Sequence, residues 1–368
     1  MKVPAVSVII PMYNAEKFIG DCLESLLAQT LKDFEVIVVD DCSTDNSVAV
    51  VQSYAEKFGG RLKIARTKKN SGAPGEPGTL GVDLSRGEYL SVLDNDDAIT
   101  PTALEELYFI AKKFDADVVA CEKYFSVPEK FWNDDDFRKK LRPTSYSSID
   151  FVSEPTLIPF DAAERVRFCF NRKILWTLWS KLIRRDFLIE NEILFADNLM
   201  QDMLATCCLV YSAERFVRVP NVINFYRERD DSLWHNVDEP KKFFEKYIRA
   251  LTTGFNHLEK FLSGRKFFKQ NPEMKYLAFE IYVREISAYL DKIYTTLPAY
   301  ELDEILQKEF SKTSCAALSA FVFSSMNFYR LKLSETLRRT AELEKIERQD
   351  KAYISELEKF LTKLLSEE

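Results

Sequence analysis

The fold of this chain is indicated most strongly by one stretch, Tyr89-Leu90-Ser91-Val92-Leu93-Asp94-Asn95-Asp96-Asp97. There, an apolar run of strand length leads directly into three carboxylates. Carboxylates packed this closely repel one another, so they need a bound divalent ion, a basic partner or full solvation. The alternative is a solvated turn before a helix cap, because Thr100-Pro101 is a good N-cap and first-turn pair. The stretch alone does not decide between the two.

Two more β-branched runs of strand length lie earlier in the chain, and each ends in turn residues. Val6-Ser7-Val8-Ile9-Ile10 runs into Pro11-Met12-Tyr13-Asn14, and Glu35-Val36-Ile37-Val38-Val39 runs into Asp40-Asp41-Cys42-Ser43-Thr44-Asp45. Apolar residues at helical spacing predict a helix over 16–29 and a second helix from 43 or 44 to 58. A further strand is expected over 62–65.

This alternation of strands and helices predicts an α/β fold with a mostly parallel sheet flanked by helices on both faces. Ligands of such sheets bind outside the carboxyl ends of the strands. We therefore expect Tyr13, Asp41 and the run from Asp94 to Asp97 to gather at one edge. A cation at that edge would favour a phosphate-bearing ligand.

The three motifs, in this order, resemble those of the family 2 glycosyltransferases, which have the nucleotide-diphospho-sugar-binding fold called GT-A. The resemblance rests on the segments 6–14 and 34–45, and on Arg86-Gly87-Glu88-Tyr89 leading into Leu93-Asp94-Asn95-Asp96-Asp97. It is close over the first hundred residues. Three ordered motifs at suitable separations are far more specific than one Asp-x-Asp pair.

The resemblance implies a role for each polar residue at the expected edge. Pro11 and Tyr13 would line the base and ribose pocket, and Asp41 would accept a hydrogen bond from the nucleobase, typically uracil. The implied nucleotide-sugar-binding set is Pro11, Tyr13, Asn14, Asp41, Asp94, Asn95, Arg227 and Arg229. Asp40 is instead expected to cap the helix that follows Ser43.

The carboxylate run would be the family's Asp-x-Asp motif. Asp96 is the preferred ligand for Mn²⁺ or Mg²⁺, Asp97 is a close competitor, and Asp94 would lie nearer the ribose. A hard cation prefers oxygen ligands and neutralises the charge that grows as a nucleoside diphosphate leaves.

One departure from the family pattern lies between the second and third motifs. Many members carry a Pro-Arg-Asn-x-Gly run where this chain has Pro77-Gly78-Thr79-Leu80-Gly81. Gly78 stands at the place of the arginine, so a positive contact is missing, and Arg66, Lys68 and Lys69 are the nearest substitutes in sequence. The segment is expected to be a Gly- and Pro-rich loop close to the nucleotide, or a simple surface loop over 73–77.

The resemblance continues less tightly into the middle of the chain. Leu178-Trp179-Ser180-Lys181-Leu182-Ile183 looks like the segment that precedes the acceptor site, and a helix opening at Gln201-Asp202 follows it. The family has Glu-Asp at this opening, and its Asp is the usual candidate for the catalytic base. Asp202 is therefore the predicted base, which would take a proton from the acceptor hydroxyl. The alternative is an ordinary first-turn acid at a helix N-terminus.

Asn224-Phe225-Tyr226-Arg227-Glu228-Arg229 resembles the stretch that closes the catalytic region in this group. Arg227 and Arg229 share one strand face, and either could contact a diphosphate or pair with nearby acids. Trp176 and Trp179 could stack on a sugar ring, but core packing is the safer interpretation. A surface or packing role suits His235.

Composition bounds the class of protein. The net charge of −7 argues against a general nucleic-acid binder, and 46% apolar residues in 368 suffice for one large core plus an appended region. The seven cysteines, which include Cys315, show no CxxC pair and suit reduced thiols in a reducing compartment. With two histidines and no paired cysteines, a zinc site is not expected.

The chain passes from Met1-Lys2-Val3-Pro4 directly into the first strand, which leaves no room for a signal peptide, and no apolar run reaches about 20 residues. We expect a cytoplasmic protein, with any membrane contact peripheral at the inner face of the cell membrane. The segment 258–275 combines Phe261, Phe267 and Phe268 with basic residues that could suit an anionic lipid surface, although an ordinary helix pair is the commoner explanation.

After about residue 240 the pattern becomes helical, with helices expected over 251–262, 274–294 and 302–310. These are broken near Gly264, Asn271-Pro272 and Pro298. The segment 331–365 carries a heptad seam that could pair with a second chain or lie back on the helices. The expected domains are a nucleotide-sugar-binding half over 1–125, an acceptor-binding half over 126–239, a helical region over 240–330 and a C-terminal amphipathic helix over 331–368.

The sequence thus predicts an inverting, metal-dependent glycosyltransferase. It would move a sugar from a UDP-sugar to a hydroxyl of a growing bacterial surface glycan, such as lipopolysaccharide or capsule, the last part resting on family analogy. A nucleotidyltransferase should instead show a Gly-rich basic loop after its first strand, where this chain has Pro11-Met12-Tyr13-Asn14. The other alternative is a non-catalytic nucleotide-binding or scaffold protein, which the changes at Gly78 and Gln201 favour.

Overall fold

The computed structural model describes residues 3–145, 150–158, 161–171, 173–193, 195–196, 198–229, 240–290 and 297–311, together with 336, 338–342, 345, 348 and 351. His235, Cys315 and the seam positions Leu343, Ile346, Asp350, Tyr353, Leu357, Phe360 and Leu364 lie outside the described residues. The predictions made for them stay predictions.

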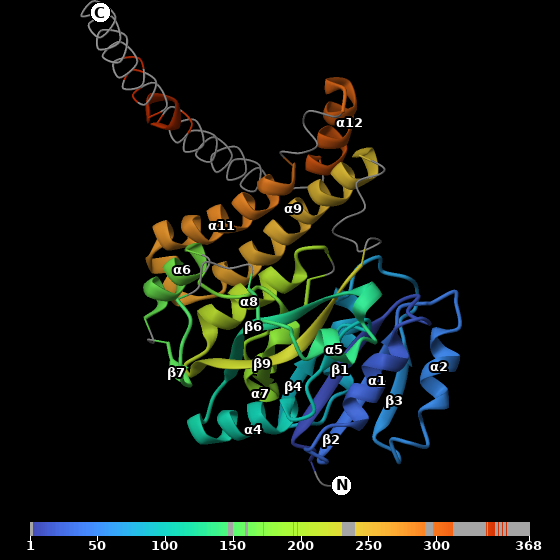
Figure 1. Ribbon diagram of the computed structural model, residues 1–368. Coiled ribbons are helices and arrows are strands. Elements are labelled where there is room, and N and C mark those ends of the chain that lie inside the picture. The colour runs from blue at the N-terminus through green and yellow to red at the C-terminus, as the bar shows by residue number, and fades with distance from the viewer. Residues whose placement is uncertain are drawn as a thin grey trace, which may run out of the picture.

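A single mixed sheet forms the centre of the molecule (Figure 1). Its order is β3-β2-β1-β4-β8-β6-β9-β5, with β7 paired to β9. The strands are β1 (Val6–Met12), β2 (Phe34–Asp40), β3 (Leu62–Arg66), β4 (Tyr89–Val92), β5 (Ala98–Ile99), β6 (Val118–Pro128), β7 (Thr156–Leu157), β8 (Lys181–Arg184) and β9 (Phe216–Glu228). β1 to β4 are parallel to one another, and β8 is antiparallel to its neighbours β4 and β6. The mostly parallel α/β sheet is confirmed.

Period-two alternation sends the side chains of each strand into two separate cores. In β1, Ile9 joins one core, while Val8 and Ile10 join the other. All three side chains are fully buried. The continuous apolar strands of the sequence therefore reflect burial on both faces.

The N-terminal helices cover the sheet as the periodicity predicts, with shorter bounds. They are α1 (Ile19–Leu27), α2 (Ser47–Ser53), α3 (Gly75–Leu84) and α4 (Ala103–Phe114). α1 and α4 lie in the same core, and α3 packs on β1 and β2. α4 begins at Ala103, two residues after the predicted Thr100-Pro101 start. The loop prediction for 70–81 was wrong from Gly75 onward, because α3 begins there.

Small residues explain why a Gly- and Pro-rich segment becomes helical here. Pro77 lies in the first turn of α3, where its missing N–H removes no helix bond. Gly81 faces Ile9 of β1 so closely that a Cβ atom would overlap the isoleucine side chain. The glycines let the helix approach the sheet, and this packing outweighs their low helix propensity.

The middle of the chain completes the same sheet rather than forming a separate unit. The predicted boundary between residues 125 and 126 falls inside β6, which pairs with both β8 and β9. The helices of this part are η1 (Glu129–Phe131), α5 (Asp135–Arg138), α6 (Ala162–Phe170), η2 (Leu178–Ser180), α7 (Arg185–Glu190) and α8 (Gln201–Ser212). Both predicted halves therefore contribute strands to one sheet.

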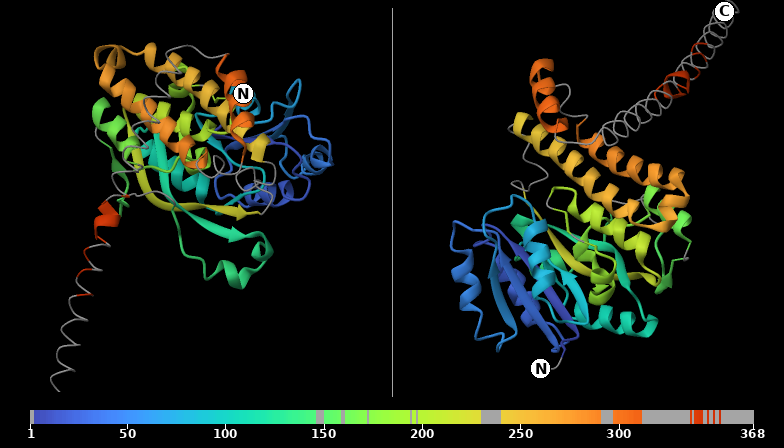
Figure 2. Two further views of the ribbon diagram at one scale, coloured as in Figure 1. Left: turned by 90° about the horizontal axis from the view of Figure 1, so that it is seen from above. Right: turned by 180° about the vertical axis from the view of Figure 1, so that it is seen from behind.

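A helical layer follows from residue 240, as predicted. It contains α9 (Pro240–Ser263), α10 (Lys266–Gln270), α11 (Pro272–Leu290) and α12 (Ala299–Phe310). α9 and α11 run side by side over α6 and α8, which Figure 1 and the two views of Figure 2 show from different sides. The predicted breaks near Gly264, Asn271-Pro272 and Pro298 are confirmed.

The phenylalanines of the segment 258–275 do not form an exposed face. Phe261 and Phe268 are buried in the core that α9, α10 and α11 share, and Phe267 is partly buried against it. The ordinary helix pair is therefore the correct interpretation of this segment. In the described part of the chain, no helix is long and apolar enough to span a bilayer.

Candidate active site

The polar residues that follow β1, β2 and β4 meet at one edge of the sheet, as predicted. Met12 of β1 pairs with Asp40 of β2, and the amide of Asp41 donates to the Met12 carbonyl at 2.7 Å. The Asn95 side-chain amide donates to the Pro11 carbonyl at 2.9 Å, which ties the carboxylate run to the end of β1. The parallel strands thus bring three sequence motifs into one site.

Asp40 and Asp41 have different roles although they are adjacent. Asp40 is buried, and its carboxylate accepts from the Ser43 amide at 3.0 Å. The capping role predicted for Asp40 was wrong, because α2 begins at Ser47 with Asn46 as its N-cap residue, and Asp40 instead stabilises the loop after β2. The Asp41 carboxylate accepts from the Thr67 hydroxyl at 2.8 Å and from the Ser71 amide at 3.0 Å. A nucleobase that bound Asp41 would have to add to these donors or replace one of them.

Tyr13 and Asn14 form the exposed rim of the site. Tyr13 is 47% exposed, which leaves its ring available to a ligand. Asn14 has a positive φ of 47°, and its side-chain oxygen accepts from the Thr44 amide at 2.8 Å. Asn14 therefore holds the β1 and β2 loops together, which shapes the pocket that the resemblance predicts.

The carboxylate run is partly exposed at Asp94, Asn95 and Asp96 and fully buried at Asp97. Burial, then the nearby charges of Asp202 and Asp96, raises the pKa of Asp94 well above its usual range. Burial also raises the pKa of Asp97, with the charges of Asp96 and Asp94 adding to the effect. The carboxylates are therefore clustered as the sequence predicts, and their ionised forms are disfavoured unless a cation or a basic side chain lies nearby.

Two arginines contact this run, Arg227 in β9 and Arg229 just after its end. Arg227 donates from its amide to Asp97 Oδ1 and from its Nε to the Asp96 carbonyl, both at 2.9 Å. Its guanidinium also pairs with Asp21 at 2.7 Å. Arg229 pairs with Asp96 Oδ2 at 3.1 Å. The Arg229 side chain is 19% exposed against 5% for Arg227, so Arg229 is better placed for the predicted diphosphate contact.

The donor set at this edge fits a hard divalent ion whose coordination a diphosphate completes. Among the described residues no group of three or more His, Cys, Asp and Glu side chains forms a complete metal site. Asp94 and Asp96 supply two accessible carboxylates, and Mg²⁺-type sites commonly use one or two carboxylates plus substrate phosphates. The geometry favours Asp96 over the buried Asp97 as a ligand.

Asp202 lies at the start of α8 and faces the carboxylate run. Its Oδ2 accepts from the Leu178 amide of η2 at 3.2 Å. Burial raises the pKa of Asp202 to about 6, against the lowering effects of the Leu178 amide, Lys181 and Gln201. A carboxylate with this pKa is largely ionised at neutral pH and basic enough to accept a proton, which suits a general base.

Lys181 also belongs to this site, although the sequence alone gives it no role within its motif. Its side chain is fully buried beside Asp202, and burial lowers its pKa to about 7. One lysine at the start of an apolar strand carries no periodic signal. Only its surroundings in the fold reveal it.

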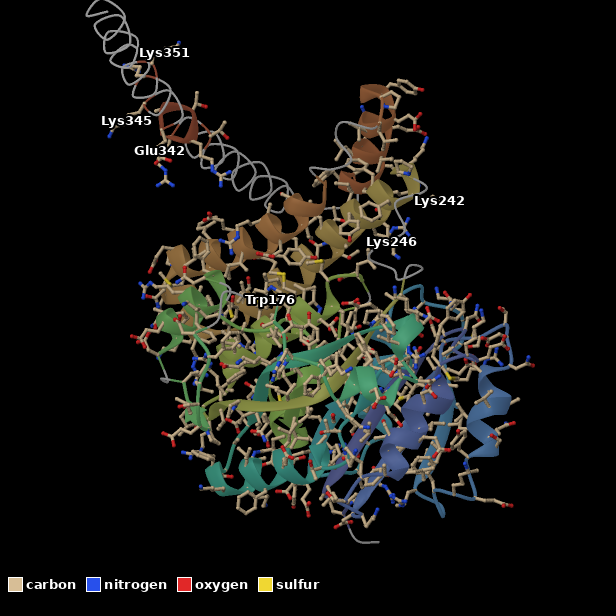
Figure 3. All side chains as sticks on the ribbon, in the orientation of Figure 1. Trp176, Lys242, Lys246, Glu342, Lys345 and Lys351 are labelled. Carbon is tan, nitrogen blue, oxygen red and sulfur yellow. The ribbon has the colours of Figure 1, made fainter. Side chains whose placement is uncertain are left out.

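Both tryptophans pack in the protein interior, as the sequence suggested. Trp179 is 4% exposed and packs edge-on against Tyr124 and in a stacked arrangement with Tyr226. Figure 3 places Trp176 between the sheet and the C-terminal helices, and it packs against the core formed there. Both rings contribute packing that fixes the segment carrying η2.

The packing around Gly78 explains why this chain has no arginine at that position. A Cβ atom at this position would lie 2.7 Å from the ring of Phe195, which is itself buried. Phe195 belongs to the segment that leads into α8. At the position where many family members carry an arginine, α3 of this chain packs directly against Phe195, in the segment that precedes α8 and Asp202.

The family model "Glycosyl transferase family 2" matches residues 7–179, which contain all three nucleotide motifs. This match places residues 7–179 of the chain in glycosyl transferase family 2. It is 27% identical over 259 residues to the uncharacterized glycosyltransferase EpsJ of Bacillus subtilis, covering 69% of this chain and 71% of EpsJ. It is 32% identical over 230 residues to a cholesterol galactosyltransferase of Borreliella burgdorferi, covering 60% of each.

A further relative links sequence and structure. The chain is 28% identical over 250 residues to TarS of Staphylococcus aureus, a poly(ribitol-phosphate) β-N-acetylglucosaminyltransferase, covering 65% of this chain and 38% of TarS. A crystal structure of TarS 1–349 in complex with UDP-GlcNAc superimposes with a TM-score of 0.61 at 20% identity, covering 88% of each chain. This likeness establishes the shared GT-A fold, including its C-terminal helices.

Proposed function

We propose that this family 2 glycosyltransferase uses a UDP-sugar and inverts the anomeric centre as it transfers the sugar to an acceptor hydroxyl. The observation that carries the proposal is the placement of Asp202 opposite Asp94, close enough for the charge of Asp202 to raise the pKa of Asp94. The carboxylates of the run from Asp94 to Asp97 are thus available for the donor, and the carboxylate of Asp202 is available for the acceptor. TarS, a relative, binds UDP-GlcNAc, which supports the choice of nucleotide.

In this proposal, Tyr13, Asn14 and Asp41 form the nucleotide end of the donor site. The exposed ring of Tyr13 would stack on the base, and Asp41 would accept a base N–H. Asp94 and Asp96 would hold Mn²⁺ or Mg²⁺, which when bound neutralises charge on the departing nucleoside diphosphate. Arg229 would contact the diphosphate, and Arg227 would keep the carboxylate run in place.

Asp202 would remove the proton from the acceptor hydroxyl as the oxygen attacks the anomeric carbon. The Leu178 amide donates to Oδ2 and so orients the carboxylate toward the acceptor side of the site. Positioning together with general-base catalysis contributes much of the rate of such a transfer. The Gln201 change removes a charge beside the base but keeps a hydrogen-bonding side chain.

The proposed acceptor is a hydroxyl of a growing bacterial surface glycan or glycolipid, and the proposed location is the cytoplasm. The relatives act on acceptors as different as poly(ribitol-phosphate) and cholesterol, according to their names, so family membership leaves the acceptor open. A screen of glycan and glycolipid acceptors with the preferred UDP-sugar would identify it.

The test is release of UDP from a panel of UDP-sugars, with water or an added acceptor as nucleophile. Asp202→Asn should lower kcat by 10²-fold or more because the base is lost. Asp186→Asn, an exposed first-turn acid of α7, is the matched control and should keep full activity. If the unaltered protein binds UDP but releases none from any sugar, and Asp202→Asn changes nothing, the non-catalytic alternative is the better account.

A further inference from the structure

Lys181 begins β8, and its ammonium group is buried with all three of its N–H groups satisfied. It donates to the Leu175 carbonyl at 2.8 Å, to the Thr177 carbonyl at 2.6 Å and to the Ser180 hydroxyl at 3.3 Å. All three acceptors lie in the six residues before Lys181. One side chain therefore fixes the shape of the whole turn that contains η2.

The charge of Lys181 has an unusual setting. Within the described residues it forms no ion pair, and burying an ammonium group without one is costly. The groups that face it are Asp202 and Cys207 from α8, Cys121 from β6 and Cys169 from α6. Burial raises the pKa of the Cys121 thiol to about 12 and that of Cys169 well above its usual value, so these thiols stay neutral. Asp202 is therefore the acidic group that interacts electrostatically with Lys181.

The turn that Lys181 organises is tied to α8 at two points. The Leu178 amide donates to Asp202 Oδ2 at 3.2 Å. One helical turn later, the Thr206 hydroxyl donates to the Trp176 carbonyl at 2.6 Å. The orientation of the Asp202 carboxylate thus depends on a peptide segment whose shape Lys181 and Thr206 set.

We propose that Lys181 is a positioning residue for the catalytic base: it folds the turn 175–180 so that the Leu178 amide holds Asp202, and its charge favours the ionised carboxylate. The inference rests on the proposed role of Asp202 as the base. Lys181 itself touches neither sugar nor nucleotide in this account. It acts through the turn and through its electrostatic field.

The proposal has a direct kinetic consequence. Replacing Lys181 with Met keeps the length of the side chain but removes the charge and the three donors. Without the cation and with a looser Leu178 amide, the pKa of Asp202 should rise further. The acid limb of the pH–rate profile should then move to higher pH, while nucleotide binding at the other edge of the site is retained.

The experiment measures UDP release from the UDP-sugar that the unaltered protein hydrolyses fastest, with UDP affinity measured by calorimetry. Lys181→Met should lower kcat by at least tenfold, change the Kd for UDP by less than threefold and move the acid limb upward by half a pH unit or more. Thr206→Val removes only the second tie and should lower kcat by a smaller factor. Lys275→Met, which removes a lysine bound to Glu259 and Ser263 in the C-terminal helices, is the matched control and should leave both quantities unchanged.

Each result decides the inference. If Lys181→Met folds and keeps the kcat and pH profile of the unaltered protein, the inference is wrong. If Lys181→Met does not fold, Thr206→Val carries the test, and an unchanged kcat in that variant overturns the inference. Activity that survives Asp202→Asn removes the base assignment and with it this proposal. Loss of activity in Asp202→Asn with no effect in the other two variants overturns the positioning role alone.

Discussion

Restoring the arginine that many family members carry should damage this protein, because Gly78 is packed against Phe195. A Cβ atom at residue 78 would lie 2.7 Å from Phe195 Cδ2, which is about 1 Å closer than an ordinary carbon contact. The ring is buried, so moving it away from residue 78 would disturb its packing. The smallest test of this packing is Gly78→Ala, and the fullest is Gly78→Arg.

The magnitudes follow from two opposing effects. Replacing a helical glycine with alanine stabilises a helix by about 0.5–1 kcal/mol, whereas overpacking a tight core costs about 1–3 kcal/mol. Gly78→Ala should therefore lose roughly 0.5–2 kcal/mol of unfolding free energy. Gly78→Arg should lose more, about 3–5 kcal/mol, since an unpaired cation would also be buried. It should lower UDP-sugar turnover as well, because Phe195 leads into the helix that carries Asp202.

Urea unfolding of both variants gives the assay, and Gly20→Ala is the matched control. Gly20 is also helical, but a Cβ there would lie 3.4 Å from the Tyr54 hydroxyl, an ordinary contact. That variant should be as stable as the unaltered protein or more so. Adding Phe195→Leu to Gly78→Ala should recover about 1 kcal/mol through the relieved contact. A Gly78→Ala protein at least as stable as Gly20→Ala would refute the reasoning.

Three further predictions concern the site. For the unaltered protein, kcat/KM should fall as pH drops below about 6, because Asp202 must be ionised to act and its pKa is about 6; a profile flat down to pH 4.5 would contradict this. The pKa of Lys181 is about 7 in the folded protein and 10.5 in the unfolded chain, so the unfolded chain binds more protons between these two pH values. The free energy of unfolding should therefore rise with pH in this range, by up to about 1 kcal/mol per pH unit. Denaturant titrations at several pH values should show a smaller slope for Lys181→Met. Arg227→Met removes the side-chain contacts of Arg227 with Asp96 and Asp21, so it should weaken metal-dependent UDP binding and lower the free energy of unfolding by about 1–3 kcal/mol. Weakened UDP binding at unchanged stability would instead indicate direct diphosphate contact by Arg227.

The sequence predicts the donor side of this fold well because the information there is local. Each of β1, β2 and β4 is an apolar run followed by polar residues, and a parallel sheet brings such ends together whatever the details of the loops. Pro11, Asp41 and Asp94 to Asp97 therefore meet as expected. The order of motifs carried most of this inference.

What the sequence could not show depends on contacts between distant segments. The glycines of 75–84 are poor helix formers, and only the proximity of Ile9 and Phe195 makes them suitable for α3. In the same way, nothing local distinguishes Lys181 from a solvated lysine at the start of a strand. Its role follows from a turn that folds back over its side chain and from α8 beyond it.

The resemblance left open which of the neighbouring charged residues face the ligand. Arg227 and Arg229 look equivalent at strand spacing, yet Arg227 is nearly buried and pairs with Asp21, whereas the more exposed Arg229 pairs with Asp96. Asp96 and Asp97 are adjacent, but only Asp97 turns inward to bond the amide of Arg227. Alternation along an extended chain predicts that the adjacent side chains of Asp96 and Asp97 point to opposite sides, but only the fold shows which of them faces the ligand.

The most direct test of the central claim is calorimetric titration with UDP, GDP and their sugars, with and without Mn²⁺, for the unaltered protein and Asp96→Ala. Asp83→Ala, which removes an exposed carboxylate of α3, is the control. The account predicts that UDP binds in a metal-dependent manner, that Asp96→Ala abolishes this binding and that Asp83→Ala keeps it. If no nucleotide binds the unaltered protein with or without metal, the carboxylate run is not a donor site and the proposed function is contradicted.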